Sequence, residues 1–311
     1  MNNLSNNKII VILGPTSSGK SDIAIKIAQK FNGEIISADS RQIYRGLDIG
    51  AGKIEGKYDL KNKIFISKNI VHYGIDIVSP KTNYSSAQFK KYADKIIVDL
   101  LKRKKMPILC GGTGFWIKAV VDNTVYPEVK PDWKLRKNLE KKSTEELFSL
   151  LLKLDAKRAQ DIDAKNPVRL IRAIEICQTL GKVPVIKDEL SKAKYNFLQI
   201  GILLSKEKLR QNIKKRLKQR FAEGMISEVE KLHREQKIGW KKIESFGLGY
   251  KLIPQYLHQE IKSQKELFEK IYSAEKNYAK RQLTWFQKDS RIVWLKNYQE
   301  IEKTVKNFLD N

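Results

Sequence analysis

The sequence has few of the residues that build disulfide frameworks or metal centres. It contains only two cysteines, Cys110 and Cys177, and three histidines among 311 residues. Two cysteines cannot make a disulfide framework, and no Cys/His spacing typical of a zinc site is present. We therefore expect a reduced protein that does not depend on a structural metal.

Long apolar runs are also missing. No stretch approaches eighteen consecutive apolar residues, so a membrane span is not expected. The first ten residues, MNNLSNNKII, lack the basic start of a signal peptide. These absences predict a cytoplasmic location and no membrane partner.

Positive charge, in contrast, is abundant. There are 61 Lys and Arg against 35 Asp and Glu, a formal net charge of +26. Such an excess indicates a polyanionic partner, nucleic acid first and an anionic membrane surface second. A lysine-rich proteome is the plainer alternative. Because 41% of the residues are hydrophobic, the chain has enough apolar side chains for a proper core.

The hydrophobic pattern alternates between buried strands and amphipathic helices. Residues 9–13, 34–38 and 106–110 are predicted strands, and helices are predicted from Gly19–Ser21 onward and over 86–101. This alternation favours an α/β fold in which helices flank a parallel sheet, as in P-loop NTPases.

The strand pattern stops near Asp122 and returns at residues 197–204. Between them we expect an all-helical insertion, residues 123–194, within a catalytic core formed by residues 1–122 and 195–311. Two or three long basic helices should then lead to Lys288, and residues 291–295 form a possible last strand.

A phosphate-binding loop follows the first predicted strand and opens the first helix. Its sequence fits G-x-x-x-x-G-K-[ST] and consists of Gly14, Pro15, Thr16, Ser17, Ser18, Gly19, Lys20 and Ser21. Backbone N–H groups and the helix N-terminus would bind phosphate oxygens, Lys20 would add a positive charge, and the Ser21 hydroxyl is the candidate ligand for Mg²⁺. The loop alone does not distinguish ATP, GTP and other diphosphates.

Two further strand ends carry candidate chemistry. Asp39 ends the strand 34–38, where parallel sheets place ligands, and is a possible general base, a Mg²⁺ ligand or merely a loop cap. Thr113 lies in a glycine-rich turn after strand 106–110 and can hydrogen-bond a substrate or leaving oxygen. Cys110, inside the apolar strand, is predicted to be a core residue.

These motifs resemble the tRNA dimethylallyltransferase (tRNA isopentenyltransferase) family in its bacterial form. The resemblance extends over residues 8 to about 296 and rests on an ordered set: GPTSSGKS at 14–21, ISADSRQIYRGLDIGAGK at 36–53, GGTG at 111–114, NPVRLIRAIE at 166–175, GYK at 249–251 and NYAKRQLTWF at 277–286.

The resemblance implies transfer of a dimethylallyl group from dimethylallyl diphosphate to N6 of adenosine 37 in tRNA. It implies that the P-loop and Arg216 hold the isoprenoid diphosphate, that Asp39 is the base, and that Thr113 lies near the reacting atoms. Mg²⁺ is the expected cofactor, and a monomer is expected. Positions implied to contact the tRNA anticodon stem-loop are Asp39, Ser40, Arg41, Gln42, Thr113, Arg136, Val168, Arg169, Leu170, Ile171, Arg172, Gly249, Tyr250 and Lys251.

Three features depart from the family pattern or lie outside it. Tyr73 stands where the family often has the second of two histidines, and Arg220 where many members carry Met; the latter is interpreted as added charge. No Cys/His zinc module of the eukaryotic type is present. Trp285 and Phe286 are predicted to be core residues.

Three alternatives stay open. A P-loop nucleotide kinase would turn over ATP, and an adenylate dimethylallyltransferase would accept free AMP or ATP in place of tRNA. A non-catalytic RNA-binding protein with a relic P-loop is the third. The basic helical insertion, with Arg136, Arg158, Arg169 and Arg172, favours an enzyme that binds the phosphates of a tRNA stem.

Overall fold

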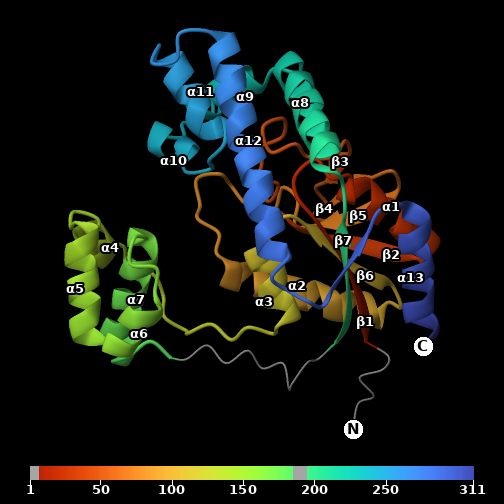
Figure 1. Ribbon diagram of the computed structural model, residues 1–311, viewed down its shortest axis with the longest axis horizontal. Coiled ribbons are helices and arrows are strands. Elements are labelled where there is room, and N and C mark those ends of the chain that lie inside the picture. Colours follow the sequence, from red (N-terminus) through yellow and green to blue (C-terminus); the bar gives the residue numbers. More distant parts are fainter. Residues whose placement is uncertain (1–6, 185–194) are drawn as a thin grey trace. The chain divides into compact units, whose positions relative to one another are not determined.

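A computed structural model describes residues 7–184 and 195–311. The chain folds as two compact units, Met1–Asn123 with Lys192–Asn311, and Thr124–Ser191 (Figure 1). The second unit covers nearly the same residues as the predicted helical insertion.

An eight-stranded sheet forms the centre of the first unit, in the order β3-β4-β5-β2-β6-β1-β7-β8. The predicted strands are confirmed as β1 (Lys8–Leu13), β2 (Gly33–Ala38), β6 (Met106–Gly111), β7 (Asn196–Ile202) and β8 (Ile292–Leu295), all joined in parallel. The β1 residues Ile9–Leu13 are fully buried, because helices cover both faces of the sheet.

One edge of the sheet differs from the prediction. Strands β3 (Lys57–Asp59), β4 (Ile64–Ser67) and β5 (Ile70–Tyr73) pair antiparallel with one another, and β5 joins β2 in parallel. The sheet is therefore mixed. The sequence did not reveal these strands because they are only three or four residues long and carry no extended apolar run.

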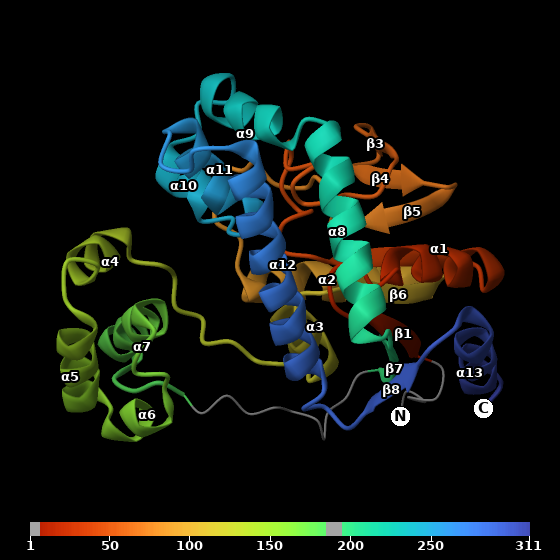
Figure 2. The same cartoon turned by 45° about the horizontal axis from the view of Figure 1, so that its top comes forward.

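Two helical layers cover the sheet (Figure 2). Helices α1 (Lys20–Lys30) and α13 (Tyr298–Asp310) pack with one face of the strands in one apolar cluster. The other face packs with α2 (Ser86–Lys102), α3 (Gly114–Val121) and the C-terminal helices in a second cluster. The α2 bounds match the predicted helix, and Ser85 begins it with a capping box to Gln88.

The C-terminal helical region is more divided than predicted. Its helices are α8 (Lys206–Ala222), α9 (Met225–Arg234), α10 (Trp240–Glu244), α11 (Gly249–Leu257) and α12 (Gln264–Phe286). Gly224 interrupts the chain between α8 and α9 in the left-handed conformation, with φ of 94°. In both ribbon views α12 is a long rod beside α8 and α11 (Figures 1 and 2).

The second unit is helical throughout residues 133–180 except for short connections. Its helices are α4 (Trp133–Leu139), α5 (Thr144–Leu154), α6 (Ala156–Asp161) and α7 (Pro167–Leu180). The side chains of Asp132, Ser143, Asp155 and Asn166 each accept a backbone N–H at a helix start. Leu147, Leu151 and Leu170 are fully buried in the core of this unit. The predicted insertion also includes residues 185–194, which lie outside the described residues.

No helix in the described ranges 7–184 and 195–311 is both long enough and apolar enough to cross a membrane.

Gly111 gives a direct test of the sheet geometry. A Cβ at this position would lie 2.2 Å from the carbonyl oxygen of Ala38 on β2. We predict that Gly111→Ala lowers the free energy of unfolding by about 1–3 kcal/mol, because the packed strands must move apart. Gly239→Ala is the control, since no described atom lies within 4 Å of its added Cβ. Equal melting temperatures for the two variants would contradict this packing.

Candidate active site

The phosphate-binding loop connects β1 to α1 and is held from two other helices. Asn212 of α8 donates from Nδ2 to the Ser17 carbonyl at 3.2 Å, and the Thr16 amide donates to Oε1 of Gln282 on α12 at 2.8 Å. Gly19 adopts φ of 83°, a left-handed conformation that its lack of a Cβ permits just before the helix begins. Helices that are distant in sequence thus fix the loop.

Two cations face this loop. Burial lowers the pKa of the Lys20 amine, and burial together with the nearby Arg220 lowers the pKa of Arg216. Arg216 donates to the Gly52 carbonyl, and its Nη1 lies 3.5 Å from the Thr16 hydroxyl. Within the described part of the chain, neither Lys20 nor Arg216 forms an ion pair with a carboxylate. Two desolvated cations with no acidic partner are the main feature of an anion site.

Asp39 and Thr113 lie next to each other at the ends of β2 and β6. The amide of Ser40 donates to Thr113 Oγ1 at 3.0 Å, and the Thr113 amide donates to the Ala38 carbonyl at 3.2 Å. Asp39 Oδ1 accepts the amide of Arg41 at 2.9 Å and that of Gln42 at 3.3 Å. These bonds order the turn through Oδ1 alone, and Asp39 Oδ2 takes no part in them.

One cavity of about 280 Å³ connects these groups. Its polar lining residues include Lys20, Ser21, Asp39 and Arg216. Its apolar lining residues include Ala24, Ile35, Ile54 and Ile75. Cations, a carboxylate and apolar side chains therefore line one cavity.

Thr113 is not in the lining of this cavity, although Gly111 and the neighbouring Asp39 are. It reaches the site through its hydrogen bond with Ser40. The remaining P-loop positions, Gly14, Pro15, Ser17, Ser18 and Gly19, shape the loop, and only Thr16, Lys20 and Ser21 line the cavity.

Helix α12 contributes a face that the sequence prediction missed. Glu275, Tyr278, Arg281 and Gln282 all line the cavity, at helical spacings of three, three and one residues. Burial and the nearby Asp39 raise the pKa of Tyr278 to about 12. The sequence does contain a pattern that could have predicted this face. Glu275, Tyr278 and Gln282 are polar residues at i, i+3 and i+7, so they lie on one side of the helix.

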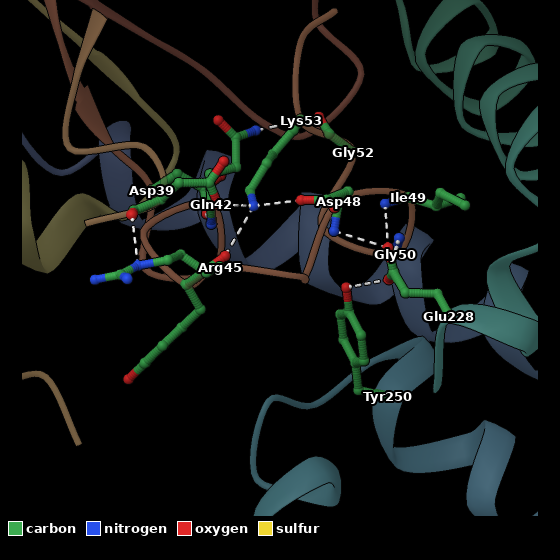
Figure 3. Close-up of polar contacts among 12 residues, drawn as sticks. Asp39, Gln42, Arg45, Asp48, Ile49, Gly50, Gly52, Lys53, Glu228 and Tyr250 are labelled. Carbon is green, nitrogen blue, oxygen red and sulfur yellow. Dashed lines mark hydrogen bonds and ion pairs between the residues drawn. The ribbon is translucent and has the colours of Figure 1, made fainter. Parts of the chain in front are cut away.

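The segment after Asp39 is tied down by an acidic side chain from α9. The Glu228 carboxylate accepts the amides of Asp48, Ile49 and Gly50 at 2.7, 2.6 and 3.0 Å, and the Tyr250 hydroxyl at 2.7 Å (Figure 3). Beside it, the Lys53 amine bonds Asp48 Oδ1 at 2.6 Å.

Tyr250, which is predicted to contact the tRNA, has an internal partner. Its side chain is buried and lines the cavity, and its hydroxyl donates to Glu228. Burial raises the pKa of Tyr250 well above its usual value. Gly249 is also buried, and it packs so closely that a Cβ there would lie 2.1 Å from the Met225 methyl group. Lys251 is exposed, as a tRNA contact requires.

The interpretation of Arg220 as simply added charge is wrong. Its side chain is 8% exposed and pairs through Nη2 with both oxygens of buried Glu275 at 2.6 and 2.7 Å. Its Nη1 donates to the Gly50 carbonyl at 3.0 Å. The pair joins α8 to α12 beside the cavity. The arginine that stands in place of the Met expected from the resemblance thus has an acidic partner of its own.

Cysteine and aromatic predictions had mixed outcomes. Cys110 is buried in β6, and burial raises the pKa of its thiol to about 12, so the core prediction is confirmed. Phe286 is buried as predicted. Trp285 is 42% exposed and its indole contacts Gly114, so the prediction of a core residue is wrong there.

Several predicted tRNA-binding residues of the second unit have internal partners. Arg136 donates to both oxygens of Glu175 at 2.8 and 2.7 Å, and Arg172 also pairs with Glu175 and donates to the Val129 carbonyl at 3.0 Å. Glu175 is buried on α7, and its two bonds with Arg136 hold α4 to α7.

Burial further separates the residues of α7. Leu170 is fully buried and Ile171 is 7% exposed, so their side chains support the core of the unit instead of facing a ligand. Val168 is 75% exposed and the side chain of Arg169 is 59% exposed, and these two remain candidates for nucleic-acid contact.

The residues fit a Mg²⁺ ion that is shared with a diphosphate. Among the described residues, no three His, Cys, Asp or Glu side chains gather as a metal cage. The Ser21 hydroxyl lines the cavity beside Lys20. Mg²⁺ is commonly held by one or two protein oxygens together with substrate phosphates and water, so this donor set suffices.

His72 of β5 also lines the cavity. It is buried, its Nε2 has no hydrogen-bond partner among the described residues, and burial lowers its pKa to about 4. The neighbouring Tyr73 hydroxyl donates instead to Glu34 at 2.8 Å, and Arg103 also binds that carboxylate. Tyr73 therefore does not replace a second histidine at the site.

Comparisons with known proteins agree on one family. The sequence profile described as IPP transferase matches residues 42–289. The chain is 40% identical to a tRNA dimethylallyltransferase of Acetivibrio thermocellus, covering 96% of this chain and 95% of that protein. It is 36% identical to a tRNA dimethylallyltransferase of Halothermothrix orenii, covering 98% and 94%.

Solved structures give the same result. The tRNA isopentenylpyrophosphate transferase from Bacillus halodurans superposes with a TM-score of 0.70 at 30% identity, covering 98% of this chain and 97% of that chain. A eukaryotic dimethylallyltransferase acting on tRNA superposes with a TM-score of 0.73 at 25% identity, covering 93% of this chain and 74% of that chain.

The lowered pKa of His72 predicts a specific loss of stability in acid. Because the folded pKa lies below the unfolded value, the unfolded chain takes up the proton first, so the stabilisation is complete above about pH 6.5 and is lost as the pH falls toward 4. The free energy of unfolding should depend less on pH in this window for His72→Gln than for the wild type. The free energy of unfolding would be measured by denaturant titration at several pH values. The same dependence on pH in the variant and the wild type would contradict the assignment.

Proposed function

The chain belongs to the IPP transferase family, and we propose that it transfers the dimethylallyl group of dimethylallyl diphosphate to N6 of adenosine 37 in tRNA. One observation carries the proposal: Lys20 and Arg216, two desolvated cations without an acidic partner in the described part of the chain, share a cavity with Asp39. The site thus combines an anion-binding region with a candidate base.

The donor is dimethylallyl diphosphate. Its diphosphate would lie against the P-loop amides, the Lys20 amine and the Arg216 guanidinium, which would exchange its contacts with Gly52 and Thr16 for phosphate oxygens. Its five-carbon chain would contact apolar lining residues such as Ala24, Ile35 and Ile75.

The reaction joins N6 of the adenine to the allylic C1 and breaks the bond from C1 to the diphosphate oxygen. Diphosphate leaves with the bonding electron pair, and Lys20 and Arg216 stabilise the charge that develops on it. Asp39 takes the proton lost by N6, which makes this weak nucleophile more reactive. Thr113 Oγ1 accepts the amide of Ser40 and so orders the turn that directly follows Asp39.

Mg²⁺ would be held by the Ser21 hydroxyl together with diphosphate oxygens. When bound, the ion supplies charge neutralisation for the leaving diphosphate. Lys20 and Arg216 supply the fixed positive charges of the protein itself at the same place.

The acceptor is the tRNA anticodon stem-loop. A formal charge of +26 suits a polyanion, and the target adenine must leave its stack to reach a cavity of this size. We propose a monomer that works in the cytoplasm on folded tRNA.

The experiment that tests the proposal is mass spectrometry of adenosine 37 after incubation of tRNA with the protein, Mg²⁺ and dimethylallyl diphosphate. We expect a dimethylallyl adduct on N6, and no adduct on tRNA that carries guanosine at position 37. A requirement for ATP hydrolysis, or transfer to free AMP but not to tRNA, would support a kinase or an adenylate dimethylallyltransferase and overturn the proposal.

Asp39→Asn separates catalysis from recognition. The amide oxygen of Asn can still accept the Arg41 and Gln42 amides, so the turn should keep its form while the base is lost. We predict a fall in the single-turnover rate of about 10²–10⁴-fold with tRNA affinity nearly unchanged. A normal rate with weakened binding would identify Asp39 as a recognition residue.

The second unit offers a matched pair of arginines for tRNA binding. Residues 124–184 contain thirteen Lys and Arg and nine Asp and Glu, so the net charge of this segment is only +4. Arg169→Gln should weaken tRNA binding and reduce the log–log salt slope by about 0.9, without affecting the melting temperature, because its side chain is exposed.

Arg136→Gln should instead lower the melting temperature, because it removes two bonds to the buried Glu175. The measurements are tRNA binding over a series of salt concentrations and thermal denaturation. Equal salt slopes for wild type and Arg169→Gln would show that Arg169 does not contact a phosphate.

A further inference from the structure

The side-chain amide of Gln282 joins two loops that carry different parts of the site. Thr16 of the P-loop donates its backbone N–H to Oε1 at 2.8 Å, and Nε2 donates to the Gly112 carbonyl at 2.8 Å. The side chain is buried at 8% exposure. A backbone N–H can only donate and a carbonyl can only accept, so these partners fix the orientation of the amide.

The two ends of this bridge have different chemical roles. Thr16 belongs to the loop proposed to hold the diphosphate, whereas Gly112 directly precedes Thr113. Thr113 in turn accepts the Ser40 amide next to Asp39. A continuous series of short contacts therefore runs from the donor loop through Gln282 to the turn that carries the base.

The bridge has little freedom to move. A Cβ at Gly112 would lie 2.5 Å from Gln282 Nε2, so the loop approaches the amide as closely as glycine allows. On the same helix, Ala279 and Phe286 are buried and Glu275 is paired with Arg220. These contacts fix α12 on both sides of Gln282.

We propose that Gln282 is a positioning residue that sets the separation between the diphosphate loop and the Thr113 loop, so that the allylic carbon of a bound donor faces the acceptor nitrogen. This inference rests on the proposed dimethylallyl transfer. The amide does not need to touch either substrate, since it acts through the two loops. Its loss should therefore reduce the rate of transfer more than the binding of either substrate.

A double-mutant cycle with Thr113 tests the proposal. The variants are Gln282→Met, which has a similar length but no amide, Thr113→Val, which keeps the shape but has no hydroxyl, and the two together. Gln287→Met at the end of the same helix is the matched control, because its side chain is exposed. The measurements are single-turnover transfer with saturating donor and tRNA, calorimetric binding of dimethylallyl diphosphate, and thermal denaturation.

We expect Gln282→Met to lower the single-turnover rate by about 10²-fold, with donor affinity changed by less than about threefold and Gln287→Met unaffected. If Gln282 acts by placing Thr113, adding Thr113→Val to Gln282→Met should lower the rate much less than it does in the wild type. The proposal would be overturned if the rate loss of the double variant equalled the product of the two single-variant losses. A Gln282→Met rate within about twofold of wild type would also overturn it.

Gln282→Glu provides the same test if Gln282→Met does not fold. Its carboxylate can accept the Thr16 amide but cannot donate to Gly112, so the rate should again fall while the P-loop stays in place. A rate within about twofold of wild type would contradict the inference. A wild-type protein that transfers no dimethylallyl group to tRNA would contradict the proposed function itself. An active wild type, with single-variant rate losses that multiply in the double variant, would contradict the role of Gln282 alone.

Discussion

The site depends on the cost of burying a polar group without a hydrogen-bond partner. Helix α12 supplies such partners along one face, where Glu275 neutralises Arg220 and Gln282 bonds Thr16 and Gly112. Because these partners come from α8, the P-loop and the turn after β6, a single helix holds three separate parts of the chain around one cavity. The strands alone would place their ends near each other but would not fix the loops that follow them.

Three buried glutamates have an internal role in this strongly basic chain. Glu175, Glu228 and Glu275 are all buried, and each one accepts hydrogen bonds from arginines or from backbone amides. Glu175 holds helices of the second unit together, and Glu228 holds the segment 48–50. Glu275 holds Arg220 beside the cavity. Among the described residues, Lys20 and Arg216 have no such acid, and this contrast marks them as the cations that would bind an anionic substrate.

Sequence alone predicted the parts of the molecule that depend on local pattern. The buried run 9–13, the P-loop and the position of Asp39 after a strand all follow from short stretches of sequence, because strand burial and loop chemistry are local properties. Thr113 was likewise predicted to follow a strand, and the parallel pairing of β2 with β6 brings it next to Asp39.

The rest could not be predicted because it depends on contacts that are distant in sequence. Gln282 bonds Thr16 across 266 positions, and nothing near either residue indicates this. Tyr250 and Leu170 lie in motifs that suggested tRNA contact, yet tertiary packing buries both. Arg136 and Arg220 looked like free positive charge until the structure placed Glu175 and Glu275 against them.

The most direct test of this account is the hydrogen exchange of the Thr16 amide in the substrate-free protein. A hydrogen bond to Gln282 within a rigid site predicts slow exchange, and it predicts that Gln282→Met speeds the exchange of Thr16 while amides in the centre of β1 stay protected. Exchange of the wild-type Thr16 amide at the rate of an unprotected loop, or no change in the variant, would contradict the claim that α12 holds the diphosphate loop in place.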